Sequence, residues 1–148
     1  MIRSHSFRPL LPILAIALLG LAGPASADDD TCVPFSAAGT AFAVGGDGPD
    51  FELEAEGIAS PGGVFSGTIV GHTNKKTSVQ HAVITLTFDN GDTLTFDTKI
   101  KPDEATGAYR GTYSIRGGTG AFEGARGEGE LLADPAGGTF SMDGTICQ

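Results

Sequence analysis

Apolar and polar residues alternate with a period of two along much of the chain. The pattern is plainest at residues 51–56, where Phe51, Leu53 and Ala55 alternate with three glutamates. Successive side chains of a strand point to opposite faces, so this segment is predicted to be a strand whose glutamates are solvated charges rather than acid–base groups. No apolar stripe of helical period follows residue 27. The chain is therefore predicted to be almost entirely β-structure.

A tight β-hairpin is predicted around Asn90-Gly91, because this dipeptide tolerates the positive φ angles of hairpin turns. The segments on either side each place their apolar side chains on one face and polar ones opposite, as neighbouring antiparallel strands do. The apolar side chains are Ala82, Ile84, Leu86 and Phe88 before the turn, and Leu94, Phe96 and Ile100 after it.

Eight strands are expected, with short turns supplied by many of the 23 glycines and 8 prolines. Their ranges are 37–44, 51–59, 63–71, 79–89, 92–101, 106–116, 119–133 and 138–146. This number suits either a closed barrel or a two-sheet sandwich, since both limit exposed sheet edges. Phe65, Tyr109 and Phe122 each stand two positions before a glycine. Glycine within a strand relieves crowding where a sheet bends sharply, so the recurrence favours the closed sheet.

Residues 111–129, GTYSIRGGTGAFEGARGEG, resemble a signature of the allene oxide cyclase and dirigent barrel superfamily. The resemblance is specific over residues 106–133 and implies an eight-stranded antiparallel barrel. It implies structural roles for the motif residues, with the GGTG segment as a turn between strands, and it carries over no catalytic residue. These motif residues are Gly117, Gly118, Thr119, Gly120, Phe122 and Gly124.

Plant members of this superfamily cyclise an unstable allene oxide of a fatty acid or steer the coupling of phenoxy radicals. Both activities hold a reactive guest in an apolar cavity. Bacteria carry many short exported relatives, and this chain resembles such a member, whose activity the resemblance does not assign. The plant proteins assemble as oligomers, so oligomerisation is possible here, although no matching surface is identified in the sequence.

The N-terminus reads as a secretory signal peptide. Arg3 and Arg8 form a basic start, residues 10–22 are apolar, and residues 25–27 are small. Cleavage before Asp28 would leave a single domain at residues 28–148, secreted or periplasmic and without membrane insertion. It would also leave 7 basic residues against 18 acidic ones, a net charge of −11 that argues against nucleic acid as a partner.

The two cysteines, Cys32 and Cys147, stand near the ends of the mature chain. An oxidising compartment favours a disulfide between them, which would enclose 114 residues. In the chain-entropy model a loop of this size is worth about 4 to 5 kcal/mol. A redox or metal role is disfavoured, because neither cysteine has CxxC spacing or a nearby histidine.

No motif predicts a cofactor or a metal site. His72 and His81 lack metal-ligand spacing and an adjacent nucleophile, and the segment 47–50 lacks the ligand spacing of a calcium loop. The glycines of residues 117–120 are not followed by the GK[ST] sequence of a phosphate-binding loop. Catalytic residues therefore stay unassigned.

Closing the predicted strands into a barrel would give it a largely apolar interior. An eight-stranded barrel either fills with side chains or holds one small ligand, and the many aromatic residues favour filling. If a ligand binds, Phe96, Tyr109 and Tyr113 are the predicted contacts, with the two hydroxyls orienting the guest. The expected lining is Leu53, Leu86, Phe88, Leu94, Phe96, Tyr109, Tyr113, Phe140 and Met142.

Three functions follow, in this order of preference. The first is a non-catalytic structural or interaction module, the second a carrier of a small apolar ligand, and the third a cyclase-like isomerase or dirigent-like guide. The enzyme ranks last because the expected lining offers no charged group to act on a guest. The carrier would need an open lumen of a few hundred cubic ångströms.

Overall fold

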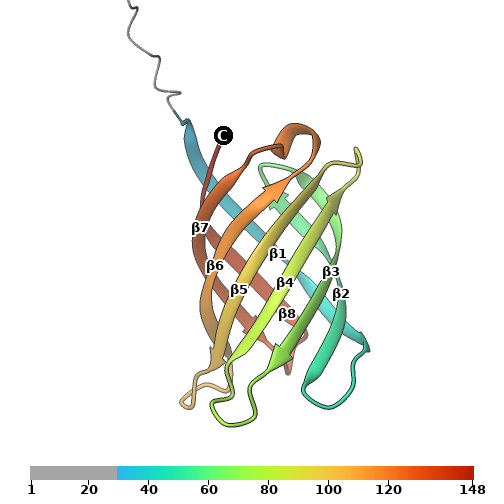
Figure 1. Ribbon diagram of the computed structural model, residues 1–148, viewed down its shortest axis with the longest axis vertical. Helices are drawn as coiled ribbons and strands as arrows, with labels where there is room; N and C mark the ends of the chain where they lie inside the picture. Colours follow the sequence, from blue (N-terminus) through green and yellow to red (C-terminus); the bar gives the residue numbers. More distant parts are fainter. Residues whose placement is uncertain (1–29) are drawn as a thin grey trace, which may run out of the picture.

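The computed structural model describes residues 30–148, which form a closed barrel of eight antiparallel strands (Figure 1). Each strand pairs with its sequence neighbours and β8 pairs with β1, so the described barrel has no edge strand. This confirms the predicted all-β, eight-stranded antiparallel barrel and excludes the sandwich. The elements are β1 (Cys32–Gly45), β2 (Asp50–Ser60), β3 (Gly63–Thr73), β4 (Gln80–Phe88), β5 (Thr93–Pro102), β6 (Tyr109–Gly118), the 3₁₀ helix η1 (Gly120–Phe122), β7 (Arg126–Asp134) and β8 (Thr139–Cys147).

The expected signal peptide, residues 1–27, lies outside the described residues. Within residues 30–148, no helix is long and apolar enough to cross a membrane.

The two ends of the barrel differ (Figure 1). At the upper end lie residues 30 and 148, the short connections 61–62 and 89–92, and the segment 119–125 that contains η1. At the lower end lie the connections 46–49, 74–79, 103–108 and 135–138. We call these the disulfide end and the loop end.

The alternation of residues 51–56 is present as predicted in β2. Phe51 and Leu53 are half-buried and Ala55 is buried, while the three glutamates between and after them are exposed. The same alternation on β4 and β5 turns Leu86, Phe88 and Phe96 into the core. One apolar face therefore lines the inside of the barrel and a polar face covers the outside.

Inward-facing glycines allow the strands to coil tightly. Gly129 of β7 and Gly144 of β8 are paired in the sheet. A Cβ atom at Gly129 would overlap the carbonyl oxygen of Asp143, and one at Gly144 would overlap that of Glu128. Of the glycines that follow Phe65, Tyr109 and Phe122, Gly67 and Gly111 also approach a neighbouring strand closely, whereas Gly124 lies after η1 with open space beside it. The expectation that these glycines mark sharp bending of a closed sheet is therefore supported at the first two and wrong at Gly124.

The hairpin between β4 and β5 forms where Asn90-Gly91 predicts it, but its turn is longer than a two-residue turn. The Gly91 N–H donates to the Phe88 carbonyl at 2.9 Å, and the Phe88 N–H donates to the Asp92 carbonyl at 2.9 Å. Gly91 has a φ of 88°, whereas Asn90 is not in the positive-φ region. The connection is thus a three-residue loop that closes on a glycine in the left-handed region.

The seventh strand begins at Arg126 rather than at residue 119 as expected. Gly117 and Gly118 end β6, Thr119 follows them, and Gly120 begins η1, so the GGTG segment joins β6 to η1. The turn of η1 directs Phe122 into the core, where it is buried. A buried aromatic side chain on a single helical turn has no two-residue period, which explains why the strand was expected to start too early.

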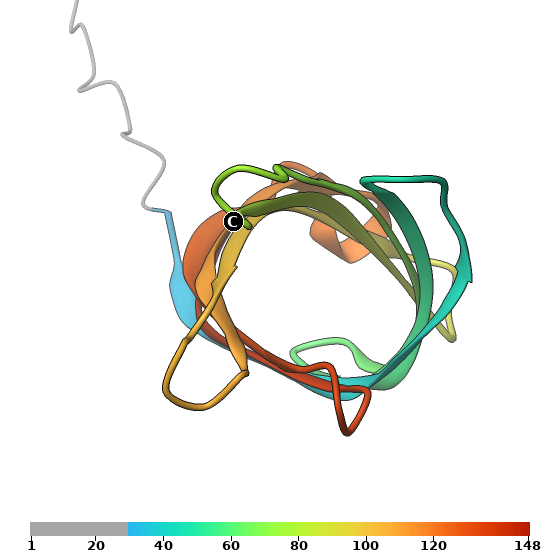
Figure 2. The same cartoon turned by 90° about the horizontal axis from the view of Figure 1, so that it is seen from below.

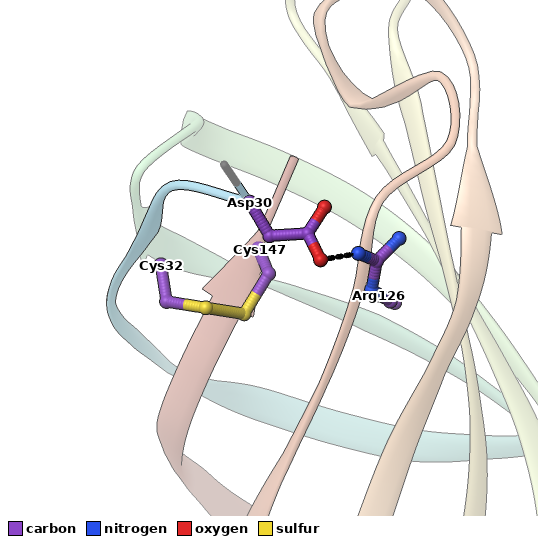
Figure 3. Close-up of a disulfide and its surroundings, with 4 residues drawn as sticks. All are labelled: Asp30, Cys32, Arg126 and Cys147. Atoms are coloured by element: carbon purple, nitrogen blue, oxygen red, sulfur yellow. Dashed lines mark ion pairs between the residues drawn. A yellow bond between two sulfur atoms is a disulfide. The ribbon is translucent and has the colours of Figure 1, made fainter. Parts of the chain in front are cut away.

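The predicted disulfide joins Cys32 to Cys147 across the β1–β8 ladder (Figure 3). Beside it, the Arg126 guanidinium of β7 forms an ion pair with the Asp30 carboxylate (Figure 3). Backbone hydrogen bonds run in both directions between Thr31 and Gln148, at 3.0 and 3.2 Å. The two ends of the described chain are therefore fastened together at the disulfide end.

Candidate ligand cavity in the lumen

The interior is packed solid toward the disulfide end. Phe96 lies in contact with both Phe35 and Tyr113, each with ring centroids 5.5 Å away. Phe65 makes a second group with Phe88 and Phe140, at 6.4 and 6.3 Å. Offset and edge-on aromatic packing of this kind fills the cross-section of a small barrel.

The η1 segment covers this aromatic core. The Phe122 ring lies 5.0 Å from the Phe88 ring. The Asp92 carboxylate accepts a hydrogen bond from the Ala121 N–H at 3.0 Å, which ties η1 to the β4–β5 turn. Viewed from the loop end, the orange η1 segment projects inward on one side of the far opening (Figure 2). The buried side chains of Phe88, Leu94 and Phe122 fill the disulfide end.

The other half of the lumen holds a cavity of about 470 Å³. It reaches the loop end, because Gly48 and Pro49 of one connection and Pro135 and Gly138 of another form its rim. Its volume is within the range of small-molecule sites. The apolar side chains of its wall are those of Ala41, Ala43, Phe51, Leu53, Ile69, Ala82, Ile84, Ile100, Leu131, Ala133 and Phe140.

Few polar side chains enter this apolar wall. Thr98 is 6% exposed, and its hydroxyl donates to the Ala82 carbonyl at 3.0 Å. Because that bond uses its only proton, the Thr98 oxygen can offer a guest only lone pairs. Nearer the mouth stand Gln80, Tyr109 and the carboxylates of Asp50 and Asp134.

Tyr113 carries a buried hydroxyl that has no hydrogen-bond partner. The residue is 2% exposed, and its hydroxyl oxygen lies against Gly129 and Gly144, where an added Cβ would come within 2.5 and 2.6 Å of it. Burial, and secondarily the negative charge of Asp143, raises the pKa of Tyr113 from 10.0 to about 12. The phenol is therefore held neutral and acts as a packing group against the two glycines.

The structure separates the three predicted ligand contacts. Tyr109 lines the cavity, whereas Phe96 and Tyr113 lie in the packed half and do not line it. Leu53 and Phe140 also line the cavity, while Leu86, Phe88, Leu94 and Met142 are buried in the packed half. The preferred expectation of a filled lumen is thus correct for one half of the barrel and wrong for the other.

Sequence reasoning missed Thr98, a buried polar side chain in the wall of the cavity. The two-residue period of β5 indicates an inward position for Thr98, because it continues the series of Leu94 and Phe96. A threonine side chain is polar and suits the outer face equally well, so its residue type alone does not indicate burial.

Other clusters offer less. Within residues 30–148, no group of three or more His, Cys, Asp or Glu side chains could hold a metal ion. The His72 Nδ1 lies 2.7 Å from an Asp50 oxygen, on the exposed surface. A groove of about 710 Å³ crosses the outside of β4 to β8, but its side chains are mainly polar and charged, including His81, Asp97 and Lys99. The lumen cavity is the site that can remove an apolar guest from water.

Comparison with known proteins bears on the fold. No protein-family model matches the chain, and no relative is found among the curated proteins. The solved structure of a pterocarpan synthase dirigent protein is similar, with a TM-score of 0.52 and 15% identity over 80% of this chain and 84% of that chain. At that identity the likeness concerns the fold alone. The chain has the dirigent-like barrel fold that the resemblance of residues 106–133 implied.

Proposed function

We propose that this protein is a non-catalytic binding module that holds one small apolar molecule in the open half of its barrel. The observation that carries the proposal is the cavity of about 470 Å³, apolar along its wall and open at the loop end. Burying apolar surface gains about 25 cal/mol per Å², so such a wall favours uptake of an apolar guest. The carrier of a small apolar ligand is therefore preferred to the structural or interaction module.

The alternatives have weaker support. Exposed apolar side chains on the outside, such as Ile58 and Val64, are the features that favour a structural or interaction module. They pair with each other across β2 and β3 but have Glu56 and Ser66 beside them, so they do not form a broad apolar face. For an isomerase, the buried polar group of the wall is Thr98, whose proton is engaged by the Ala82 carbonyl.

A fluorescent apolar probe tests the proposal directly. N-phenyl-1-naphthylamine has about 17 non-hydrogen atoms, and at about 0.4 kcal/mol per atom it would bind with a Kd of roughly 10 μM. We expect saturable one-to-one fluorescence enhancement with the oxidised protein. Failure to saturate at any concentration up to the solubility of the probe would refute the proposal.

A cavity-filling variant locates the site. Ala133→Phe places a ring in the open lumen next to Tyr109, its partner in the sheet, and is expected to weaken probe binding at least tenfold. Ala38→Phe is the matched control, because Ala38 is an exposed position of β1 that does not line the cavity. If both variants are folded by circular dichroism and bind the probe equally well, the probe binds elsewhere on the protein.

Export remains part of the proposal. A protein recovered from its producing cells with a mass that begins at Asp28 would support the secreted or periplasmic location, and an intact N-terminus would oppose it.

A further inference from the structure

The charged groups that line the cavity are of one sign. Asp50 at the start of β2 and Asp134 at the end of β7 are its charged lining residues, and no lysine or arginine of the described chain joins them. One oxygen of Asp50 contacts His72, and one oxygen of Asp134 accepts the Ala136 N–H at 3.0 Å. Each carboxylate therefore keeps a free oxygen at the mouth.

The connections of the loop end carry Asp47, Asp103 and Glu104 against Lys75 and Lys76. The adjoining strand ends add Lys101 and Arg110, and Arg110 lies 3.7 Å from Asp103. None of these four basic residues lines the cavity. The charges that line the path of a head group out of the lumen are therefore the two carboxylates, beside neutral polar groups such as Gln80 and Tyr109.

We infer that the cavity selects apolar guests with a neutral or cationic head group and rejects those with an anionic one, such as fatty acids. This inference rests on the proposed function, since it concerns the same cavity. An anionic head meets only neutral donors at the mouth, those of Gln80 and Tyr109, together with two like charges, and the buried Thr98 oxygen offers it no proton. A hydroxyl or ammonium head can instead donate to the carboxylates.

The expected weakening of anionic binding depends on how far the two carboxylates are exposed to water. Asp50 is 66% exposed, so water screens its charge strongly. For an anionic head about 6 Å from each carboxylate, Coulomb repulsion in water weakens binding about tenfold without salt and about threefold at 0.15 M ionic strength.

Two probes with the same apolar body test the inference. N-phenyl-1-naphthylamine is neutral, and 8-anilinonaphthalene-1-sulfonate adds an anionic group to it. Their Kd values are measured at pH 8 in about 10 mM and about 150 mM salt. We expect the ratio of the anionic to the neutral Kd to fall about twofold between these two salt concentrations.

The variant Asp50→Asn/Asp134→Asn keeps one acceptor oxygen at each position and should lower that ratio about sevenfold in about 10 mM salt. The matched control Asp89→Asn/Glu123→Gln removes the same net charge at the disulfide end and should leave the ratio as it is. If the ratio of the two Kd values changes neither with salt nor with the substitutions of Asp50 and Asp134, the inference is overturned. Tighter binding of the anionic probe at low salt than at high salt also overturns it. Absence of binding by the neutral probe overturns the proposed function itself.

Discussion

Removing the hydroxyl of Tyr113 should make the protein more stable. The oxygen is buried without a partner, so folding strips it of water and returns no hydrogen bond. Tyr113→Phe keeps the ring, which packs edge-on against Phe96 and near Phe35. The substitution therefore deletes an unfavourable group while leaving the packing in place.

The magnitude follows from the desolvation of one hydroxyl, which protein mutational data put at about 1 to 3 kcal/mol. We expect a gain near the lower value, about 1 kcal/mol at pH 7, because the loss of the oxygen also removes its van der Waals contacts with Gly129 and Gly144. In a domain of this size that gain raises Tm by about 4 °C.

The pH dependence has a definite sign. The pKa of Tyr113 is raised to about 12 in the folded protein, so folding favours the neutral phenol. The free energy of unfolding keeps its full value with respect to this group below pH 10. It falls as pH rises from 10 toward 12, and the loss is about 1 kcal/mol at pH 11. Tyr113→Phe lacks the group, so its advantage over the parent protein should widen above pH 10.

Urea unfolding of both proteins at pH 7, 9 and 11 measures these differences. Tyr109→Phe is the control, because it removes a phenol from the cavity wall and leaves the Tyr113 hydroxyl in place. If Tyr113→Phe is instead less stable by 1 kcal/mol or more at pH 7, the hydroxyl has a partner such as a bound water, and the reasoning fails.

Three further predictions concern the scaffold. Gly129→Ala should lower the free energy of unfolding by about 2 to 3 kcal/mol, because its Cβ meets the neighbouring strand; a loss below 0.5 kcal/mol in urea would contradict the close approach. Cys32→Ser/Cys147→Ser should lower it by about 2 to 5 kcal/mol, and an unchanged Tm would show that the disulfide constrains little. Asp92→Ala should speed hydrogen exchange at the Ala121 amide at least fivefold, whereas unchanged exchange would remove Asp92 as the anchor of η1.

The fold was predictable because its determinants are local. The alternation at residues 51–56, the Asn90-Gly91 turn and the glycines within strands each report on a few neighbouring residues. Together they predicted eight strands and favoured a closed sheet over a sandwich, and the resemblance of residues 111–129 implied the antiparallel barrel. The helical turn at residues 120–122 escaped because one turn is too short to show a period.

The cavity was not predictable from the same signals. Tyr109 and Tyr113 stand on one face of β6, yet they lie four residues apart, or about 13 Å along the strand. That distance puts one at the open half and the other in the packed half. Which half a residue joins depends on the stagger of all eight strands, and alternation along a single strand contains no information about stagger.

The fastening of residues 31 and 148 to each other has a practical consequence. Both lie at the end of the barrel opposite the cavity mouth. A surface linker or a fused partner attached through the C-terminus would therefore leave the mouth facing outward into solution. The same proximity makes the protein suitable for circular permutation, in which a short bridge joins the old ends and a new opening is cut in a connection such as 61–62, away from the cavity.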